Sequence, residues 1–327
     1  MDVLSDVVAA MRTGEPRSAR VEWYGPWGQR FLPAPGGGFQ VILQGSCWLI
    51  PREGEPVALG VGDVVFMPRG HDHALADHPS TPLAEAACDP QDGTWSAQRY
   101  AAASVGLPPD GTGPATVTGP ATVTLCGAYQ LDPSRAHPLL RDVPDVLHLP
   151  ARLGRHPEIR AAVELLGGEL ERPRLGADTV VPALLDMLLL FILRAWFDQP
   201  RPPAGEQGPA HGWAAALGDR AVSAALDAVH RAPDAPWTVE SLAARGGLSR
   251  AAFAKRFAAT VGRPPLGYLT WWRMTTAARL LRETDSPLSS VAERVGYGSE
   301  FAFANAFKRE YGLAPGRYRR GGTGRRD

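Results

Sequence analysis

The chain has 327 residues, enough for two domains that each bury a core of their own. Its three cysteines are too few for the disulfide framework of a small secreted protein, and the first residues lack the basic and apolar regions of a signal peptide, so we expect a cytoplasmic location. Basic and acidic residues balance at 34 each, which for the whole chain argues against a polyanionic partner.

The balance hides an asymmetry between the two parts of the chain. Residues 1–200 carry 15 arginines against 23 acidic residues, whereas residues 201–327 carry 19 basic residues against 11 acidic ones. This pattern predicts an acidic body joined to a basic module that meets a polyanion.

The amino-terminal part shows short β-rich runs separated by Gly, Pro and Asp, at Phe39–Leu43, Cys47–Ile50 and Val64–Met67. Their close spacing, with no helical period between them, favours a barrel or sandwich over a parallel sheet with crossover helices. A tandem Gly-Pro-Ala-Thr-Val-Thr at residues 113–124 predicts a duplicated loop insertion, because two copies are too few to form a solenoid.

Two helices are predicted after the β-rich region. One begins at Glu158, and the second runs from about Asp178 to Asp198 and is apolar nearly all round. That second helix raises the alternative of a membrane span, but Asp186 and Arg194 interrupt it. We therefore expect it to pack on the barrel on one side and on a second subunit on the other.

Beyond a Pro- and Gly-rich linker, the chain predicts a first helix-turn-helix unit. Thr238–Phe257 reads as two short amphipathic helices around a Gly246-Gly247 break, and Ser249 is placed to cap the second helix. The outward face of that second helix is small or polar and basic, as a helix that enters the major groove requires.

The same arrangement recurs about fifty residues later. Leu288–Val295 forms a first helix, and Ser299–Arg309 forms a second one after a Gly-Tyr-Gly turn. Between the two units, Pro265–Arg282 is predicted to be one long helix that holds them at a fixed separation. Two such reading helices can enter successive major grooves of one duplex, about 34 Å apart.

From about Trp237 to Arg320 the sequence resembles the AraC family of bacterial transcription regulators. The most specific part is the ending, with Gly296-Tyr297-x-Ser299-Glu300, then Phe303, Phe307-Lys308-Arg309, Gly312, Pro315 and Tyr318-Arg319. The resemblance implies base-reading positions at Arg250, Ala251, Ala254 and Lys255 in the first unit and at Glu300, Phe301 and Asn305 in the second, with Lys308 and Arg309 able to reach phosphates. Alanine at two first-unit positions implies contact with thymine methyls or reliance on phosphates.

Residues 62–77 resemble the second sequence motif of the cupin barrels, in which a metal-bearing member uses the histidine at His73 as a ligand. The earlier motif with two His and a Glu is missing, because the matching strand offers Gln40 and Cys47. Histidines one residue apart on a strand point to opposite faces, so we expect His71 and His73 not to share an ion without a turn between them. A divalent metal at these two histidines and a neutral, hydrogen-bonded His73 in a metal-free barrel both stay open.

The amino-terminal half more narrowly resembles the cupin-type sensor domains of AraC-like regulators, through Gly45-x-x-Trp48-Leu49, Cys126-Gly127-x-Tyr129 and His137-Pro138-Leu139-Leu140. Some relatives respond to reactive chlorine species through cysteine oxidation, and the resemblance places Cys126 at one of their cysteine positions. The second cysteine of those relatives has no counterpart here. Any pairing of Cys47, Cys88 and Cys126, or three ordinary reduced thiols, is compatible with the sequence.

A small organic molecule is the second candidate input to this domain. It would bind in the barrel mouth, where an apolar pocket could be lined by Trp48, Phe66, Phe39 and Trp23.

Together these features predict an α+β multidomain protein with an amino-terminal cupin β-barrel and a carboxyl-terminal all-α domain of two helix-turn-helix units. Its expected parts are a sensor domain at 1–155, a helical dimerisation segment at 156–198, a linker at 199–216 and a DNA-binding domain at 217–327. We expect a cytoplasmic homodimer that binds double-stranded promoter half-sites and meets RNA polymerase if it activates. A small ligand or a thiol oxidant at the barrel would shift the disposition of the DNA-binding domains.

No Gly-rich phosphate loop or Ser/His/Asp order stands out, so we do not expect an enzyme. The alternatives are a metal-dependent cupin enzyme fused to a DNA-binding domain, a redox-independent regulator that responds to a small molecule, and a nucleic-acid-binding module without a regulatory role.

Overall fold

The structure is a computed structural model that describes residues 2–33, 36–85, 100–105, 120–131, 137–152, 154–199 and 212–323. The chain divides into two compact units. The sheet unit comprises Arg12–Ala136 and Val143–Pro200, and the helical unit comprises Met1–Met11, His137–Asp142 and Arg201–Asp327. Most of the predicted linker, residues 200–211, and the first copy of the predicted tandem insertion lie outside the described residues.

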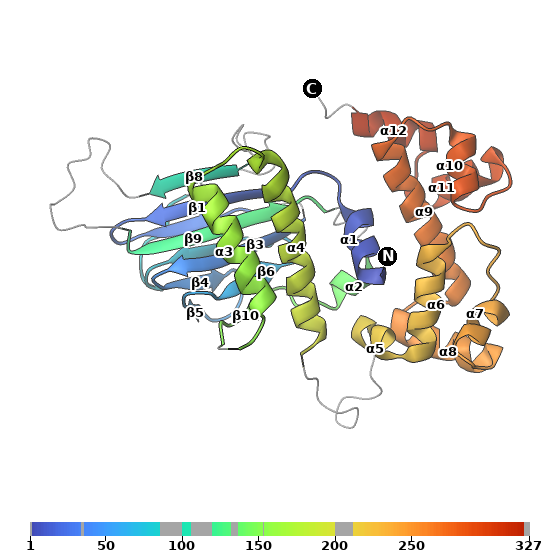
Figure 1. Ribbon diagram of the computed structural model, residues 1–327, viewed down its shortest axis with the longest axis horizontal. Helices are drawn as coiled ribbons and strands as arrows, with labels where there is room; N and C mark the ends of the chain where they lie inside the picture. The colour runs from blue at the N-terminus through green and yellow to red at the C-terminus, as the bar shows by residue number, and fades with distance from the viewer. Residues whose placement is uncertain are drawn as a thin grey trace. The chain divides into compact units, whose positions relative to one another are not determined.

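The sheet unit contains two β-sheets (Figure 1). The larger has six strands in the order β10-β6-β3-β9-β1-β8 and the smaller has four in the order β2-β7-β4-β5, and all neighbours are antiparallel except β1 and β8. The strands are β1 Arg17–Trp23, β2 Gly28–Phe31, β3 Gly37–Gln44, β4 Cys47–Pro51, β5 Val57–Leu59, β6 Val64–Met67, β7 His73–Ala76, β8 Tyr100–Val105, β9 Thr122–Tyr129 and β10 Leu147–Leu149.

The two sheets enclose one common core. Val21 and Ile42 of the larger sheet share a buried cluster with Leu49 and Leu75 of the smaller one. Because side chains alternate across a strand, each of these residues faces inward while its neighbours face outward. The predicted barrel-type domain is therefore confirmed.

Two helices, α3 (Pro157–Glu171) and α4 (Ala177–Phe197), cover the outer face of the larger sheet (Figure 1). The Tyr129 hydroxyl on that face donates a hydrogen bond of 2.8 Å to the backbone carbonyl of Leu185 in α4. Among the described residues, α4 is the one helix long and apolar enough by length and composition to cross a membrane. Its buried residues pack inside the unit, as a core helix requires.

The predicted apolar mouth of the barrel is wrong for three of its four residues. Trp48 of β4 is half-buried and lies on the outer face of the smaller sheet, because its neighbours Cys47 and Leu49 take the inward positions. Phe39 and Phe66 are fully buried and pack around the ring of Tyr129, with ring centroids 5.6 Å and 6.4 Å from it. They therefore face α4 across the outer side of the sheet, because Gln40 and Val65 take the inward positions of the alternation. Trp23 faces the inner core and stacks on Trp27.

The helical unit holds the remaining helices. They are α1 Val3–Met11, α2 Pro138–Arg141, α5 Trp213–Gly218, α6 Arg220–Arg231, α7 Val239–Arg245, α8 Arg250–Val261, α9 Pro265–Glu283, α10 Leu288–Arg294, α11 Glu300–Tyr311 and α12 Pro315–Thr323. The two predicted helix-turn-helix units are α7–α8 and α10–α11, and α9 is the long helix between them.

Both helices of the first unit begin at capping residues that the sequence indicates. Thr238 and Ser241 form a reciprocal capping box at α7, and the Ser249 hydroxyl accepts a hydrogen bond from the backbone N–H of Ala252 at the start of α8. These side chains satisfy backbone donors that have no partner within the helix, and so they determine where each helix begins.

Residues Met1–Met11 and His137–Asp142 lie within the predicted sensor domain at 1–155, yet they pack with the carboxyl-terminal helices. Helix α1 buries Val3, Val7 and Met11, and Arg282 of α9 donates a hydrogen bond to the carbonyl of Ala10 at 3.3 Å. Periodicity marks α1 as amphipathic but does not say which core takes its apolar face.

Candidate functional site

The helices α8 and α11 are built alike, at an offset of fifty residues. Each follows a serine cap, at Ser249 and Ser299. Each is anchored by two fully buried phenylalanines one turn apart, Phe253 and Phe257 in α8 and Phe303 and Phe307 in α11. Since the inward side of both helices is occupied by these rings, the opposite side of each is available to a ligand.

The structure places the predicted DNA-contacting residues on those outward sides. In α8, Arg250, Ala251 and Lys255 are exposed and Ala254 is half-buried. In α11, the exposed residues are Glu300, Phe301, Asn305, Lys308 and Arg309. Phe301 is 78% exposed, which leaves its aromatic ring accessible to an apolar contact at this predicted reading position.

Glu240 is a residue of this surface that the motif did not reveal. Its carboxylate lies 2.9 Å from Nε of Arg250, so it links α7 to the start of α8. A hydrogen bond from its own backbone N–H, and after that the charge of Arg250, lower the pKa of the Glu240 carboxyl. Both side chains are exposed, so the pair orients Arg250 and contributes little to stability. The only feature of the sequence that points to Glu240 is the presence of a glutamate in the first turn of α7.

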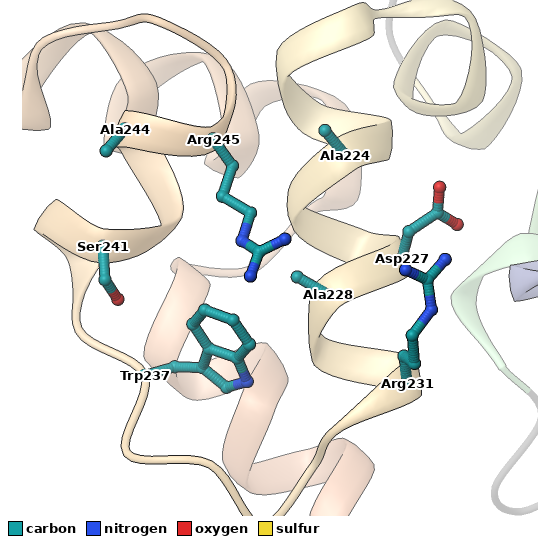
Figure 2. Close-up of a pocket in the computed structure, with 8 residues that line it drawn as sticks. All are labelled: Ala224, Asp227, Ala228, Arg231, Trp237, Ser241, Ala244 and Arg245. Carbon is teal, nitrogen blue, oxygen red and sulfur yellow. The ribbon is translucent and has the colours of Figure 1, made fainter.

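A cavity of about 760 Å³ lies between α6 and α7 (Figure 2). Its lining includes Trp237 and Arg245, and the Arg245 guanidinium carbon is 5.0 Å from the centroid of the Trp237 ring. Figure 2 shows the arginine reaching from α7 toward the indole and α6. None of the lining residues is a predicted DNA-contacting residue.

In the sheet unit, Gln40 of β3 and His73 of β7 meet between the two sheets. The His73 Nδ1 lies 3.1 Å from the carbonyl oxygen of His71, so Nδ1 carries the proton and Nε2 accepts from the Gln40 amide at 3.1 Å. Burial lowers the pKa of His73 to about 4, which keeps the ring neutral at pH 7. The buried Gln40 Oε1 has no hydrogen-bond partner among the described residues.

The two histidines considered for a metal do not converge. His71 Nε2 lies 3.1 Å from an Asp145 carboxylate oxygen, whereas His73 Nε2 is occupied by Gln40. Within the described ranges, no group of three His, Cys, Asp or Glu side chains could hold an ion. The donor set around His73 therefore does not fit a resident divalent metal.

The two described cysteines differ in their surroundings. Cys47 is buried in the core between the sheets, and burial raises the pKa of its thiol to about 12. Cys126 is half-buried and pairs across β9 and β3 with Gln40. The two are not joined to each other by a disulfide, and Cys88 lies outside the described residues. Because the thiolate is the reactive form, Cys47 is poorly suited to react with an oxidant.

A buried polar chain joins four segments of the helical unit. The Tyr268 hydroxyl of α9 lies 3.1 Å from His137 Nε2 and 2.7 Å from His230 Nε2 in α6, and His230 Nδ1 lies 3.4 Å from an Asp6 carboxylate oxygen in α1. The rings of Trp213 and Trp271 pack edge-on against His137, at 4.4 Å and 5.0 Å between centroids. We call Asp6, His137, His230 and Tyr268 the His-Tyr-His chain.

The fold and these surfaces define a DNA-binding protein with two helix-turn-helix units and a cupin domain. A cupin family model matches residues 2–198, and a helix-turn-helix family model matches residues 242–321. The chain is 34% identical over 322 residues to a putative AraC-like transcription regulator of Streptomyces lividans, with 98% of both chains covered. It therefore belongs to the AraC-like transcription regulators.

Two further relatives are informative. The RCS-specific HTH-type transcriptional activator RclR of Escherichia coli is 31% identical over 198 residues, which cover 60% of this chain and 66% of that protein. The crystal structure of the DNA-binding domain of AdpA in complex with a target DNA is 34% identical, with a TM-score of 0.31, and covers 33% of this chain and 96% of that one.

Proposed function

We propose that this regulator binds promoter DNA by placing α8 and α11 in two successive major grooves. The observation that carries the proposal is the matched pair of capped helices, each anchored by two buried phenylalanines. Reading contacts would come from Arg250, Ala251, Ala254, Lys255, Glu300, Phe301 and Asn305, with Lys308 and Arg309 on phosphates.

The test begins with selection of a binding site from random DNA with the full-length chain. Lys255→Ala and Asn305→Ala are then each expected to weaken binding to that site by about 1–3 kcal/mol with the thermal midpoint unchanged. Arg220→Ala is the matched control, because it removes one exposed charge from α6, outside both reading helices. Unchanged affinity of both reading variants would contradict the proposal, and so would equal binding to unrelated DNA at physiological salt.

We propose that the sheet unit receives the signal and carries out no catalysis. Gln40 supplies a buried acceptor without a partner, which a small effector with a hydrogen-bond donor could satisfy. Cys126 is the other candidate, since one relative is named as an RCS-specific activator and Cys126 lies opposite Gln40 in the register of β9 and β3. Support for a sensor over an enzyme comes from the relatives, which are named as transcription regulators.

The two inputs separate in a reporter strain. Cys126→Ser should abolish a response to hypochlorite if the thiol is the sensor and leave it intact if a ligand at Gln40 is the signal. Gln40→Leu keeps the thiol and removes the buried acceptor. It should leave the response to hypochlorite intact if the thiol is the sensor, and abolish the response if a ligand at Gln40 is the signal. Metal analysis of untagged protein, with His73→Ala as control, tests the cupin enzyme directly.

We propose that control reaches the DNA-binding helices through α1 and His137–Asp142. Both belong to the helical unit, yet each is joined through the backbone to the sheet unit, at Arg12 and at Val143. A change of state in the sheet unit would then alter how these two segments pack on α6 and α9. Loss of the effector response in Asp6→Asn, with basal DNA affinity retained, would support this route. An intact response would contradict it.

We also propose a cytoplasmic homodimer. Leu165 of α3 and Val180 and Met187 of α4 are 58%, 42% and 44% exposed, on helices whose other sides are buried. A second copy of the chain is the occupant this proposal assigns to that apolar stripe. A promoter-bound dimer would contact RNA polymerase if it activates.

A further inference from the structure

Arg273 of α9 reaches the segment that connects α6 to α7. Its Nε donates a hydrogen bond to the carbonyl of Pro233 at 2.6 Å, and its Nη2 donates one to the carbonyl of Ala235 at 2.9 Å. An arginine can make both bonds at once because its donors form a rigid planar fork, which a lysine lacks. The spacer helix is thereby fixed to the entry of the first helix-turn-helix unit.

The same guanidinium also touches the second unit. Its central carbon lies 5.9 Å from the centroid of the Tyr297 ring, in the turn between α10 and α11. Gly296 in that turn has φ +77°, and a Cβ there would lie 2.7 Å from Arg273 Nη2 and 2.7 Å from the carbonyl oxygen of Asp234. Only glycine allows this approach, so the backbone segment that leads into the first unit, the arginine and the turn of the second unit are in direct contact.

This contact restrains the tilt of the two units relative to each other, which α9 alone does not. The two units pack on opposite ends of α9, with Tyr268 in the aromatic cluster of the first and Met274 and Leu281 in the buried core of the second. A single shared helix leaves each unit free to tilt about it. A side bridge from the middle of the helix to both units restrains that tilt.

We propose that Arg273 is a positioning residue that sets the separation and orientation of α8 and α11, and so determines which spacing between two DNA boxes the regulator accepts. The inference rests on the proposed function, in which both helices read one duplex. Arg273 itself need not touch the DNA.

The experiment uses the full-length chain and the DNA site selected by it. Binding is titrated on three kinds of DNA: the selected site, versions with one base pair inserted or deleted between the boxes, and versions with one box scrambled. One base pair rotates the second box by roughly 35° about the duplex axis, so the wild type should lose affinity steeply on the altered spacings.

Arg273→Ala and Arg273→Lys should lower affinity for the selected site by about tenfold while the penalty for altered spacing shrinks to about threefold or less. Their affinity for DNA with a single intact box should equal that of the wild type, which a general loss of folding would not allow. Arg279→Lys is the matched control, because this α9 arginine has no hydrogen bond or ion pair to another described residue in the structure.

Two results would overturn the inference alone: an equal loss of affinity on every DNA, or an unchanged spacing preference in both Arg273 variants. Failure of the wild type to select any two-box site would overturn the proposed function, and this inference with it. Thermal unfolding of each variant shows that the comparison is made between folded proteins.

Discussion

The hydroxyl of Tyr268 lies 2.7 Å from Nε2 of His230, and this short contact belongs to a hydrogen-bond chain with a single direction. The backbone N–H of Leu139 donates to His137 Nδ1 at 3.0 Å, so the proton of that ring is on Nε2 and points at Tyr268. The phenol must then donate to His230, whose own proton lies on Nδ1 and faces Asp6. One backbone amide thus sets the tautomers of both histidines.

Tyr268→Phe should destabilise the helical unit by about 1–3 kcal/mol, because it leaves two buried imidazole nitrogens without a partner. Amide hydrogen exchange should also become faster in α1 and in residues 137–142, since the phenol connects both segments to α9. Tyr297→Phe is the control, since that half-buried phenol makes no hydrogen bond to another described residue. Equal unfolding curves for Tyr268→Phe and the wild type would refute the role of the chain.

Acidification should unfold the sheet unit through His73. Burial lowers the pKa of the folded ring from 6.5 to about 4, so between these values the unfolded chain binds a proton that the folded chain does not. The contribution of neutral His73 to the free energy of unfolding is therefore fully present above about pH 6.5. It is lost as the pH drops toward 4, by about 3 kcal/mol in all.

Urea unfolding of the full-length chain across this pH range measures the effect. In His73→Gln the loss of stability between pH 6.5 and 4 should shrink, because glutamine does not titrate. His78→Gln removes an exposed histidine and should follow the wild type. An identical pH dependence in all three proteins would show that His73 does not account for the loss.

Glu240→Gln should weaken discrimination between the selected site and unrelated DNA. The carboxylate holds Arg250 at 2.9 Å and adds a negative charge beside the reading surface. Without it, Arg250 is free to contact any phosphate, so affinity for unrelated DNA should rise by about two- to fivefold at low salt. Titrations at two salt concentrations measure this, with Glu283→Gln of α9 as the control for loss of an exposed carboxylate. An unaltered specificity ratio would argue against orientation by Glu240.

Met187→Glu should convert a dimer into monomers without unfolding the sheet unit. Met187 is 44% exposed on α4, so a charge there is compatible with the folded monomer and is costly only when a second copy covers it. Sedimentation at several protein concentrations measures the change. Glu164→Gln on an exposed side of α3 is the control, and a variant that sediments like the wild type would place the dimer contact elsewhere.

The sequence by itself determined the features that depend on residues near one another in the chain. Capping residues Thr238 and Ser249 and the phenylalanines one turn apart act within a single helix, so both helix-turn-helix units are predicted from their spacing. The closely spaced β-rich runs and the Gly62–His73 motif likewise indicate the barrel. The charge asymmetry follows from composition alone and agrees with a basic module that binds DNA.

Only the tertiary structure decided which distant residues meet. Asp6, His137 and Tyr268 are separated by more than a hundred residues from one to the next, and nothing in their local patterns says that they share one buried chain. For the same reason the sequence predicts Phe39 and Phe66 at the barrel mouth, whereas both lie on the outer side of the larger sheet. Burial in a core and contacts such as those of Arg273 depend on how the elements pack, and that is a property of the whole fold.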